Sequence, residues 1–161
     1  MGSGKTSVAR ALGQKLNCRT VDLDQAITEE EERTPSEIIE QDGENTFREV
    51  ETNVLQQLLE DDSARVLALG GGAWARQRNR DLIAERKAFT VWLDAPFELC
   101  WQRIAVAGSE RPLARDRESA QHLYNARRAA YALTKLHLEV SREKSVGELA
   151  EEIRQNFLTP Q

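Results

Sequence analysis

Residues 2–6, Gly2-Ser3-Gly4-Lys5-Thr6, have the types and spacing that phosphate chemistry requires. They match the second half of the pattern G-x-x-x-x-G-K-[ST], in which backbone N–H groups and a helix N-terminus surround phosphate oxygens. In this pattern the lysine reaches the terminal phosphates and the final hydroxyl binds Mg²⁺. We therefore predict that this segment, called the phosphate loop below, binds ATP with Mg²⁺. The alternative is a Gly-Ser-rich tail ahead of a helix.

Two carboxylates, Asp22 and Asp24, lie at the exit of a short strand expected at residues 19–22. Ligands in open α/β sheets bind at this end of the strands. Residues two apart along a strand point the same way, so both acids are expected to face one site. One would hold Mg²⁺ through water, and the other would accept the proton of a substrate hydroxyl. The alternative is that one of them caps the next helix by accepting backbone N–H groups.

Three consecutive glycines, Gly70, Gly71 and Gly72, follow an apolar strand expected at residues 65–69. Three glycines in a row cost backbone entropy on folding. A close approach between a ligand and the backbone would justify that cost. We therefore predict that this segment, the glycine triplet, lines a binding site.

Several arginines are candidates for binding anions. Arg48 is flanked by Glu44 and Glu51 at helical spacing, and the ordinary explanation for this spacing is a surface ion pair. Arg111 lies in a charged segment with glycine and proline, which predicts a mobile loop. Arg127 lies on the helix that follows this loop. The alternative for these basic residues is a solvated helical face.

The chain alternates short β-rich runs with longer helical patterns, which is typical of βαβ units with a parallel sheet. The expected strands are residues 19–22, 65–69, 88–93 and 136–140. The expected helices are residues 5–16, 36–40, 44–60, 79–86, 96–104, 119–133 and 146–157. The fold class is therefore α/β.

The composition argues against two classes of partner, nucleic acids and membranes, and favours one cellular compartment. The net charge of −5 argues against a nucleic-acid partner, because a phosphate backbone requires a basic surface. No apolar run approaches the roughly 18 residues that a membrane helix needs, so no membrane partner is expected. The two cysteines, Cys18 and Cys100, lie far apart and there is no secretion signal, which together favour a reducing cytoplasm.

The ordered set of motifs resembles the shikimate kinase family over nearly the whole chain. The motifs are G-S-G-K-T, D-L-D, G-E-N-T-F-R-E-V-E, G-G-G-A, V-W-L-D-A-P, R-P-L and R-R-A-A-Y. The resemblance implies ATP-dependent phosphorylation of the shikimate 3-hydroxyl in aromatic amino-acid biosynthesis. It also implies one domain over residues 1–161, a three-layer P-loop NTPase-like parallel sheet with helices on both faces, a lid around residues 107–118, and a monomer.

On the phosphate side, the resemblance implies a role for each matching residue. Lys5 and the rest of the phosphate loop would bind ATP, with Lys5 also catalytic. Thr6 and Asp22 would bind the metal ion. Arg111 would be a catalytic lid arginine that closes over the transferred phosphate.

On the acceptor side, the resemblance implies that Asp24 binds the ring hydroxyls of shikimate and acts as a base. Arg48 and Arg127 would grip the shikimate carboxylate from two sides. The glycine triplet would line the pocket with backbone N–H groups. One departure from the family pattern is Leu69, where the family usually has Thr or Ser.

The largest departure is at the start, because the first glycine of the phosphate pattern would lie two residues before Met1. The strand that leads into the loop, central in the family's five-stranded sheet, is missing too. A start codon chosen too far downstream, or a fragment, would explain this. We expect an upstream-extended chain to be more stable and more active.

Two other functions remain open. Another small-molecule P-loop kinase, such as a gluconate kinase, would share the phosphate loop. A non-catalytic shikimate-kinase-like binding protein would explain the truncated loop.

Overall fold

The computed structural model describes residues 2–61, 65–107 and 116–159. In chain order, the elements of this part are α1 (Lys5–Leu16), β1 (Thr20–Asp22), α2 (Leu23–Glu31), α3 (Pro35–Asp42), α4 (Glu44–Asp61), β2 (Val66–Ala68), α5 (Gly71–Ala75), α6 (Gln77–Glu85), β3 (Val91–Asp94), α7 (Phe97–Ala107), α8 (Arg117–Tyr131), β4 (Leu136–Glu139) and α9 (Val146–Leu158). The order confirms the α/β alternation expected from the sequence.

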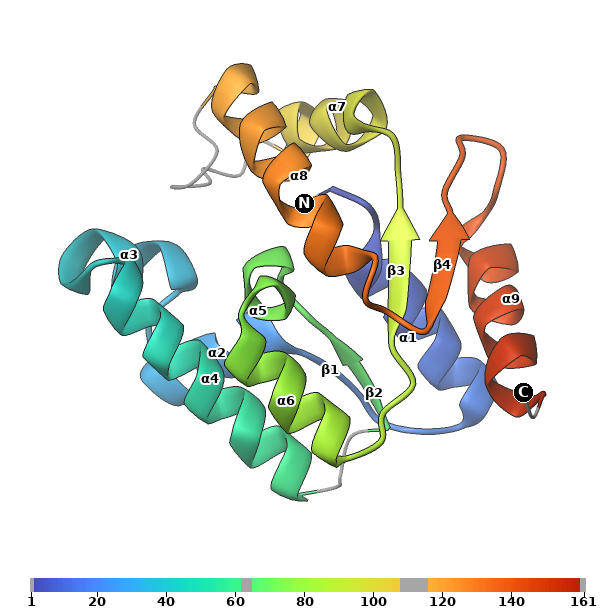
Figure 1. Ribbon diagram of the computed structural model, residues 1–161, viewed down its shortest axis with the longest axis horizontal. Helices are drawn as coiled ribbons and strands as arrows, with labels where there is room; N and C mark the ends of the chain where they lie inside the picture. Colours follow the sequence, from blue (N-terminus) through green and yellow to red (C-terminus); the bar gives the residue numbers. More distant parts are fainter. Residues whose placement is uncertain (1, 62–64, 108–115, 160–161) are drawn as a thin grey trace.

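The strands form two parallel pairs. β1 pairs with β2, with Thr20 opposite Val66, and β3 pairs with β4, with Val91 opposite Leu136. In Figure 1, α1 passes behind β3, whereas α6 and α8 lie in front of the strands. The predicted parallel, layered arrangement with helices on both faces is confirmed.

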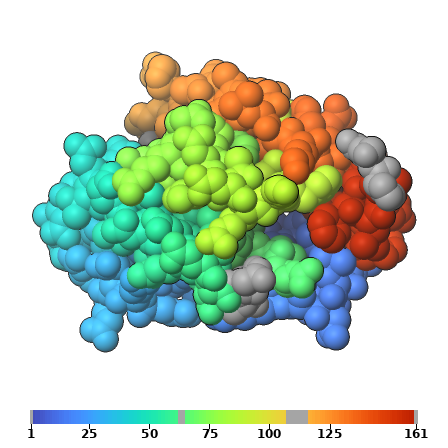
Figure 2. Space-filling view, turned by 60° about the horizontal axis from the view of Figure 1, so that its bottom comes forward, coloured from blue at the N-terminus to red at the C-terminus, as the bar shows by residue number. Residues whose placement is uncertain are grey.

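Two apolar cores hold the molecule together. One joins α1, β3, β4 and α9, and α9 packs along α1 although the two helices lie at opposite ends of the sequence (Figures 1 and 2). The other joins α2, α3, α4 and α6 around fully buried residues such as Leu23, Ile38 and Leu55. β2 contributes Val66 and Ala68 to the first core, while Leu67 and Leu69 pack against the second, so this strand lies between the two cores.

A cavity of about 700 Å³ lies between β2 and β3. Its walls include residues 66–69 of the β2 segment, residues 90–93 of the β3 segment, and Val8 and Leu12 of α1. Figure 2 looks toward the hollow between the blue N-terminal helix and the yellow-green residues that lead into β3. Among the described strands no ladder joins β2 to β3. The predicted sheet without its central strand matches this arrangement.

Two short helices were not predicted from the sequence. α2 begins at Leu23, directly after β1, because the Asp22 carboxylate accepts the backbone N–H of Asp24 and caps the helix. α5 begins at Gly71, inside the glycine triplet. None of the helices in the described ranges is both long and apolar enough to cross a bilayer.

Candidate active site

The phosphate loop has the backbone shape that its glycines allow. Gly2 and Gly4 have φ angles of 64° and 89°, a region that residues with a side chain rarely adopt. Gly4 lies directly before α1, and no side chain caps this helix. The first N–H groups of a helix have no partner within the helix, so an anion is a suitable ligand for them.

The loop is held from one side by α7. A Cβ on Gly2 would lie 2.5 Å from the carbonyl oxygen of Cys100, so α7 packs directly against the loop backbone. Arg103, also on α7, donates from Nη1 to the carbonyl oxygen of Gly2 over 3.2 Å. Arg103 was not predicted as a site residue, because nothing in its local sequence relates it to a loop 101 residues away.

Thr6 and Asp22 lie together, as the sequence predicted. The Thr6 hydroxyl donates to Asp22 Oδ2 over 2.6 Å, while Asp22 Oδ1 accepts the Asp24 N–H over 3.0 Å. Asp22 therefore caps α2, as the alternative prediction stated. The same carboxylate also accepts the hydrogen bond from Thr6 with its other oxygen. A hydroxyl and a carboxylate are oxygen ligands of the kind that Mg²⁺ prefers.

The prediction that Asp22 and Asp24 point the same way along one strand was wrong. β1 ends at Asp22, and Asp24 lies in the first turn of α2. Asp24 nevertheless reaches the glycine triplet, since a Cβ on Gly70 would lie 3.3 Å from Asp24 Oδ1. Helix geometry, and not strand alternation, brings this carboxylate to the site.

The glycine triplet is where the predicted acceptor-side residues meet. A Cβ on Gly71 would lie 3.3 Å from Arg127 Nη1, and a Cβ on Gly72 would collide with the guanidinium of Arg48. Together with Asp24 at Gly70, three side chains from three different helices contact three successive glycines. The absence of side chains on the triplet is what makes this close approach sterically possible.

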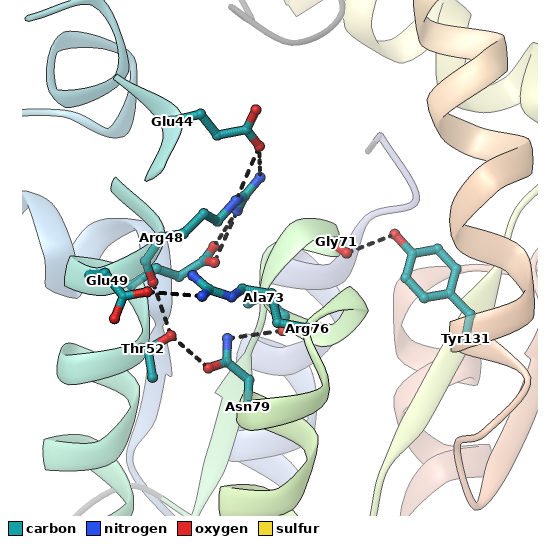
Figure 3. A network of polar contacts seen from close by, with 10 residues as sticks. Glu44, Arg48, Glu49, Thr52, Gly71, Ala73, Arg76, Asn79 and Tyr131 are labelled. Atoms are coloured by element: carbon teal, nitrogen blue, oxygen red, sulfur yellow. Dashed lines mark hydrogen bonds and ion pairs between the residues drawn. The ribbon is translucent and has the colours of Figure 1, made fainter. Parts of the chain in front are cut away.

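Arg48 is part of a buried ion pair. Its Nη1 lies 3.0 and 2.9 Å from the two carboxylate oxygens of Glu51, and its Nη2 donates to Glu44 over 3.0 Å (Figure 3). The Glu51 side chain is only 1 % exposed, so the surface ion pair considered from the sequence is wrong for this partner. Burial raises the pKa of Glu51 above its ordinary value, although the positive charge of Arg48 opposes this shift.

A series of buried hydrogen bonds joins α4 to α5, the helix that begins in the glycine triplet. Thr52 donates to Asn79 Oδ1 over 2.8 Å, and Asn79 donates from Nδ2 to the carbonyl oxygen of Ala73 over 3.0 Å (Figure 3). Thr52 and Asn79 are fully buried. These contacts fix the helix that carries Arg48 relative to the glycine triplet. Their only trace in the sequence is a polar residue on each of two apolar helix faces.

Arg127 faces the triplet from α8. Two hydrogen bonds join α8 to α5. The hydroxyl of Tyr131 on α8 donates to the carbonyl oxygen of Gly71 over 3.3 Å. The indole of Trp74 on α5 donates to the carbonyl oxygen of Ala130 over 2.9 Å. Burial lowers the pKa of Arg127, and the nearby positive charge of Arg48 also lowers it. Two guanidinium groups close to each other create a place where a small anion is electrostatically favoured.

The phosphate loop and the glycine triplet border one cavity. Its lining includes Ser3 and Lys5 of the phosphate loop, Gly70 and Gly71 of the triplet, and Arg127. Lys5, Asp24, Arg48 and Arg127 are thus brought to one region, not to separate clefts. Arg111 and the central part of the predicted lid, residues 108–115, lie outside the described residues.

The family comparison supports this arrangement independently. The family model described as shikimate kinase matches residues 1–158. The chain belongs to the shikimate kinase family. It is 40 % identical to the shikimate kinase of Cereibacter sphaeroides, over 99 % of this chain and 79 % of that protein. It is 37 % identical to the shikimate kinase of Lactococcus lactis, over 98 % and 93 % of the two chains.

Solved structures of shikimate kinases agree with the fold. The structure of the Acinetobacter baumannii shikimate kinase in complex with shikimate matches with a TM-score of 0.90 and 33 % identity, over 98 % of this chain and 88 % of that one. The Aquifex aeolicus shikimate kinase matches with a TM-score of 0.78 and 30 % identity, over 98 % and 90 % of the two chains. The predicted family and fold class are therefore confirmed.

Proposed function

We propose that this chain transfers the γ-phosphoryl group of ATP to the 3-hydroxyl of shikimate. The observation that supports this most strongly is the convergence of Asp24, Arg48 and Arg127 on the glycine triplet, next to the phosphate loop. Shikimate carries a carboxylate and ring hydroxyls, which are the groups that two arginines and one acid recognise. The family and the shikimate-bound relative from Acinetobacter baumannii support the same substrate.

In this proposal the acceptor is fixed by its carboxylate. Arg48 and Arg127 donate charge-assisted hydrogen bonds from two helices, and such bonds are roughly twice as strong as neutral ones. Glu51 orients Arg48 through two contacts of 3.0 and 2.9 Å. Holding the acceptor in line with the phosphate converts a bimolecular step into an effectively unimolecular one.

Asp24 then faces the ring hydroxyls. Its carboxylate lies beside Gly70 at the start of the triplet, so it accepts a hydrogen bond from the attacking hydroxyl and takes up the proton as the O–P bond forms. The γ-phosphoryl group leaves ADP during the same step. A loose transition state demands positive charge around its oxygens more than strong proton removal.

On the donor side, the phosphate loop and Lys5 hold the ATP phosphates. Thr6 and Asp22 offer a hydroxyl and a carboxylate within 2.6 Å of each other, a donor set that suits Mg²⁺ with its remaining positions filled by water and phosphate. An ion bound by Thr6 and Asp22 would neutralise part of the phosphate charge. No cluster of three or more His, Cys, Asp or Glu side chains offers another metal site within the described ranges.

Arg111 supplies a further positive charge from the lid in this proposal, and lid closure excludes water that would hydrolyse ATP. The proposal also includes a monomeric protein in the cytoplasm. The alternative of a non-catalytic shikimate-binding protein predicts shikimate binding by calorimetry without ATP turnover. Another small-molecule P-loop kinase predicts ATP turnover that shikimate does not stimulate.

The carboxylate clamp is tested by Arg48→Lys. Lysine keeps the positive charge beside Glu51 but loses the planar fork that matches a carboxylate. We expect the KM for shikimate to rise about 10- to 100-fold, since a hydrogen bond to a charged group contributes about 1.5–3 kcal/mol. The KM for ATP should not change. Steady-state kinetics in both substrates provide the measurement.

The matched control is Arg154→Lys. Arg154 also pairs with a glutamate three residues away, Glu151, but it lies on α9. Its substitution should leave both KM values unchanged. If Arg48→Lys and Arg154→Lys have the same small effect on the KM for shikimate, Arg48 does not bind the acceptor carboxylate.

A further inference from the structure

A second arginine of α8 makes a contact that the proposed chemistry does not use. Arg128 forms a two-pronged ion pair with Asp94, the last residue of β3, with Nη1–Oδ1 and Nη2–Oδ2 distances of 2.6 and 2.9 Å. The Asp94 side chain is only 14 % exposed. Its Oδ2 also lies 2.9 Å from Nε2 of His137 on β4. The pair therefore connects α8 to the C-terminal end of β3 and, through His137, to β4.

Aromatic rings hold the Arg128 guanidinium in place. It lies 4.8 Å from the centre of the Trp92 ring, and Trp92 stacks on His137 at 4.2 Å. Arg128 also donates to the Tyr124 hydroxyl over 2.8 Å, and Tyr124 donates to the carbonyl oxygen of Ala95 over 3.0 Å. A planar guanidinium that is both hydrogen-bonded and stacked has little freedom to move.

The charge state of this pair is settled by its contacts. Burial raises the pKa of Asp94, but hydrogen bonds from Arg128 and His137 lower it more, so the pKa lies below its ordinary value. The hydrogen bond to Asp94 raises the pKa of Arg128. Both groups are charged at neutral pH.

The neighbouring residue, Arg127, faces the glycine triplet. Successive residues of an α-helix point about 100° apart, so one helix can present Arg128 to β3 and Arg127 to the acceptor side. α8 is fixed to α5 by Tyr131 and Trp74, and to β3 by Arg128. A change at Asp94 therefore alters the rotation and position of the helix segment that carries Arg127.

We propose that the Asp94–Arg128 pair is a positioning device for Arg127. It sets the guanidinium of Arg127 at the distance from the glycine triplet that the acceptor carboxylate needs. In this inference Asp94 and Arg128 act through Arg127 and not by binding the acceptor themselves. This inference rests on the proposed function, because it assigns the pair a role in binding shikimate.

The test is Asp94→Asn, which keeps the shape of the side chain and removes its charge. We expect the KM for shikimate to rise about tenfold, since small displacements of a binding group have large effects on binding and rate. The KM for ATP should be unchanged, and kcat should change by less than about threefold. Glu151→Gln is the control, because it breaks an arginine–carboxylate pair of comparable length on α9.

A double-mutant cycle separates positioning from general stability. If Asp94 acts through Arg127, adding Asp94→Asn to Arg127→Ala should not raise the KM for shikimate further. Additive effects in the double variant would overturn the inference, as would a parallel loss of kcat and of affinity for both substrates. If the unsubstituted chain phosphorylates shikimate and Arg127→Ala raises the KM for shikimate, but Asp94→Asn does not, only this inference fails. If the unsubstituted chain neither binds shikimate nor phosphorylates it, the proposed function fails as well.

Discussion

Replacing Lys5 with methionine is expected to lower the rate of shikimate phosphorylation by on the order of 10²–10³-fold, the typical effect of removing one group that stabilises charge in a transition state. Lys5 is the first residue of α1 and lines the cavity together with Gly70 and Gly71 of the glycine triplet. Methionine keeps the length of the side chain and removes its charge. Shikimate binding, measured by calorimetry, should be retained because the acceptor side is unchanged.

Lys15→Met is the control for this substitution. Lys15 lies at the other end of the same helix and pairs with Glu151 at the surface. The turnover of this variant should equal that of the unsubstituted chain. A Lys5→Met variant with a turnover within about threefold of the unsubstituted chain would show that the phosphate loop does not carry the reaction.

Adding an extended apolar segment of about five residues, joined to Gly2 by the missing first part of the phosphate loop, is expected to raise the melting temperature by about 10–20 °C. The reason is the cavity between β2 and β3, whose walls are largely apolar, and across which no described strand pairs with either of these two. An extended segment supplies backbone hydrogen bonds to both edges and apolar side chains to both faces. Burying three such side chains contributes about 5 kcal/mol at roughly 1.5–3 kcal/mol each.

That free energy converts into temperature at about 2–4 °C per kcal/mol for a chain of this size. Calorimetric melting and amide hydrogen exchange in β2 and β3 provide the measurement. A Gly-Ser segment of the same length is the control and should leave the melting temperature unchanged. ATP turnover should rise in the apolar version as well, because the added strand would fix the start of the phosphate loop. Equal melting of both versions contradicts the prediction.

The sequence predicted the long amphipathic helices well, because their apolar residues recur at helical spacing over several turns. α4 and α9 are close to their expected ranges for this reason. β1 was predicted at residues 19–22 and lies at Thr20–Asp22, although three residues are too few for an alternating pattern to appear. The helix that follows, α2, was missed because its buried face consists of only Leu23 and Ile27, and most of the residues around them are acidic or polar.

The site shows the same division. Motifs predicted which residue types would gather around the glycine triplet, and the geometry agrees for Asp24, Arg48 and Arg127. Spacing could not reveal that Glu51 is buried, since helical spacing is identical for buried and exposed pairs. The contact of Arg128 with Asp94, 34 residues away in the sequence, depends on tertiary packing that no local pattern contains.

The hydrogen bond between the Trp74 indole and the carbonyl oxygen of Ala130 gives the molecule an internal optical sensor. Indole emission responds to its hydrogen bonding and to nearby charge. Trp74 follows the glycine triplet, while Ala130 lies on the same helix as Arg127. An anion that draws these two helices together therefore changes the environment of this fluorophore, and occupancy of the acceptor site can be titrated without a label or a coupled assay.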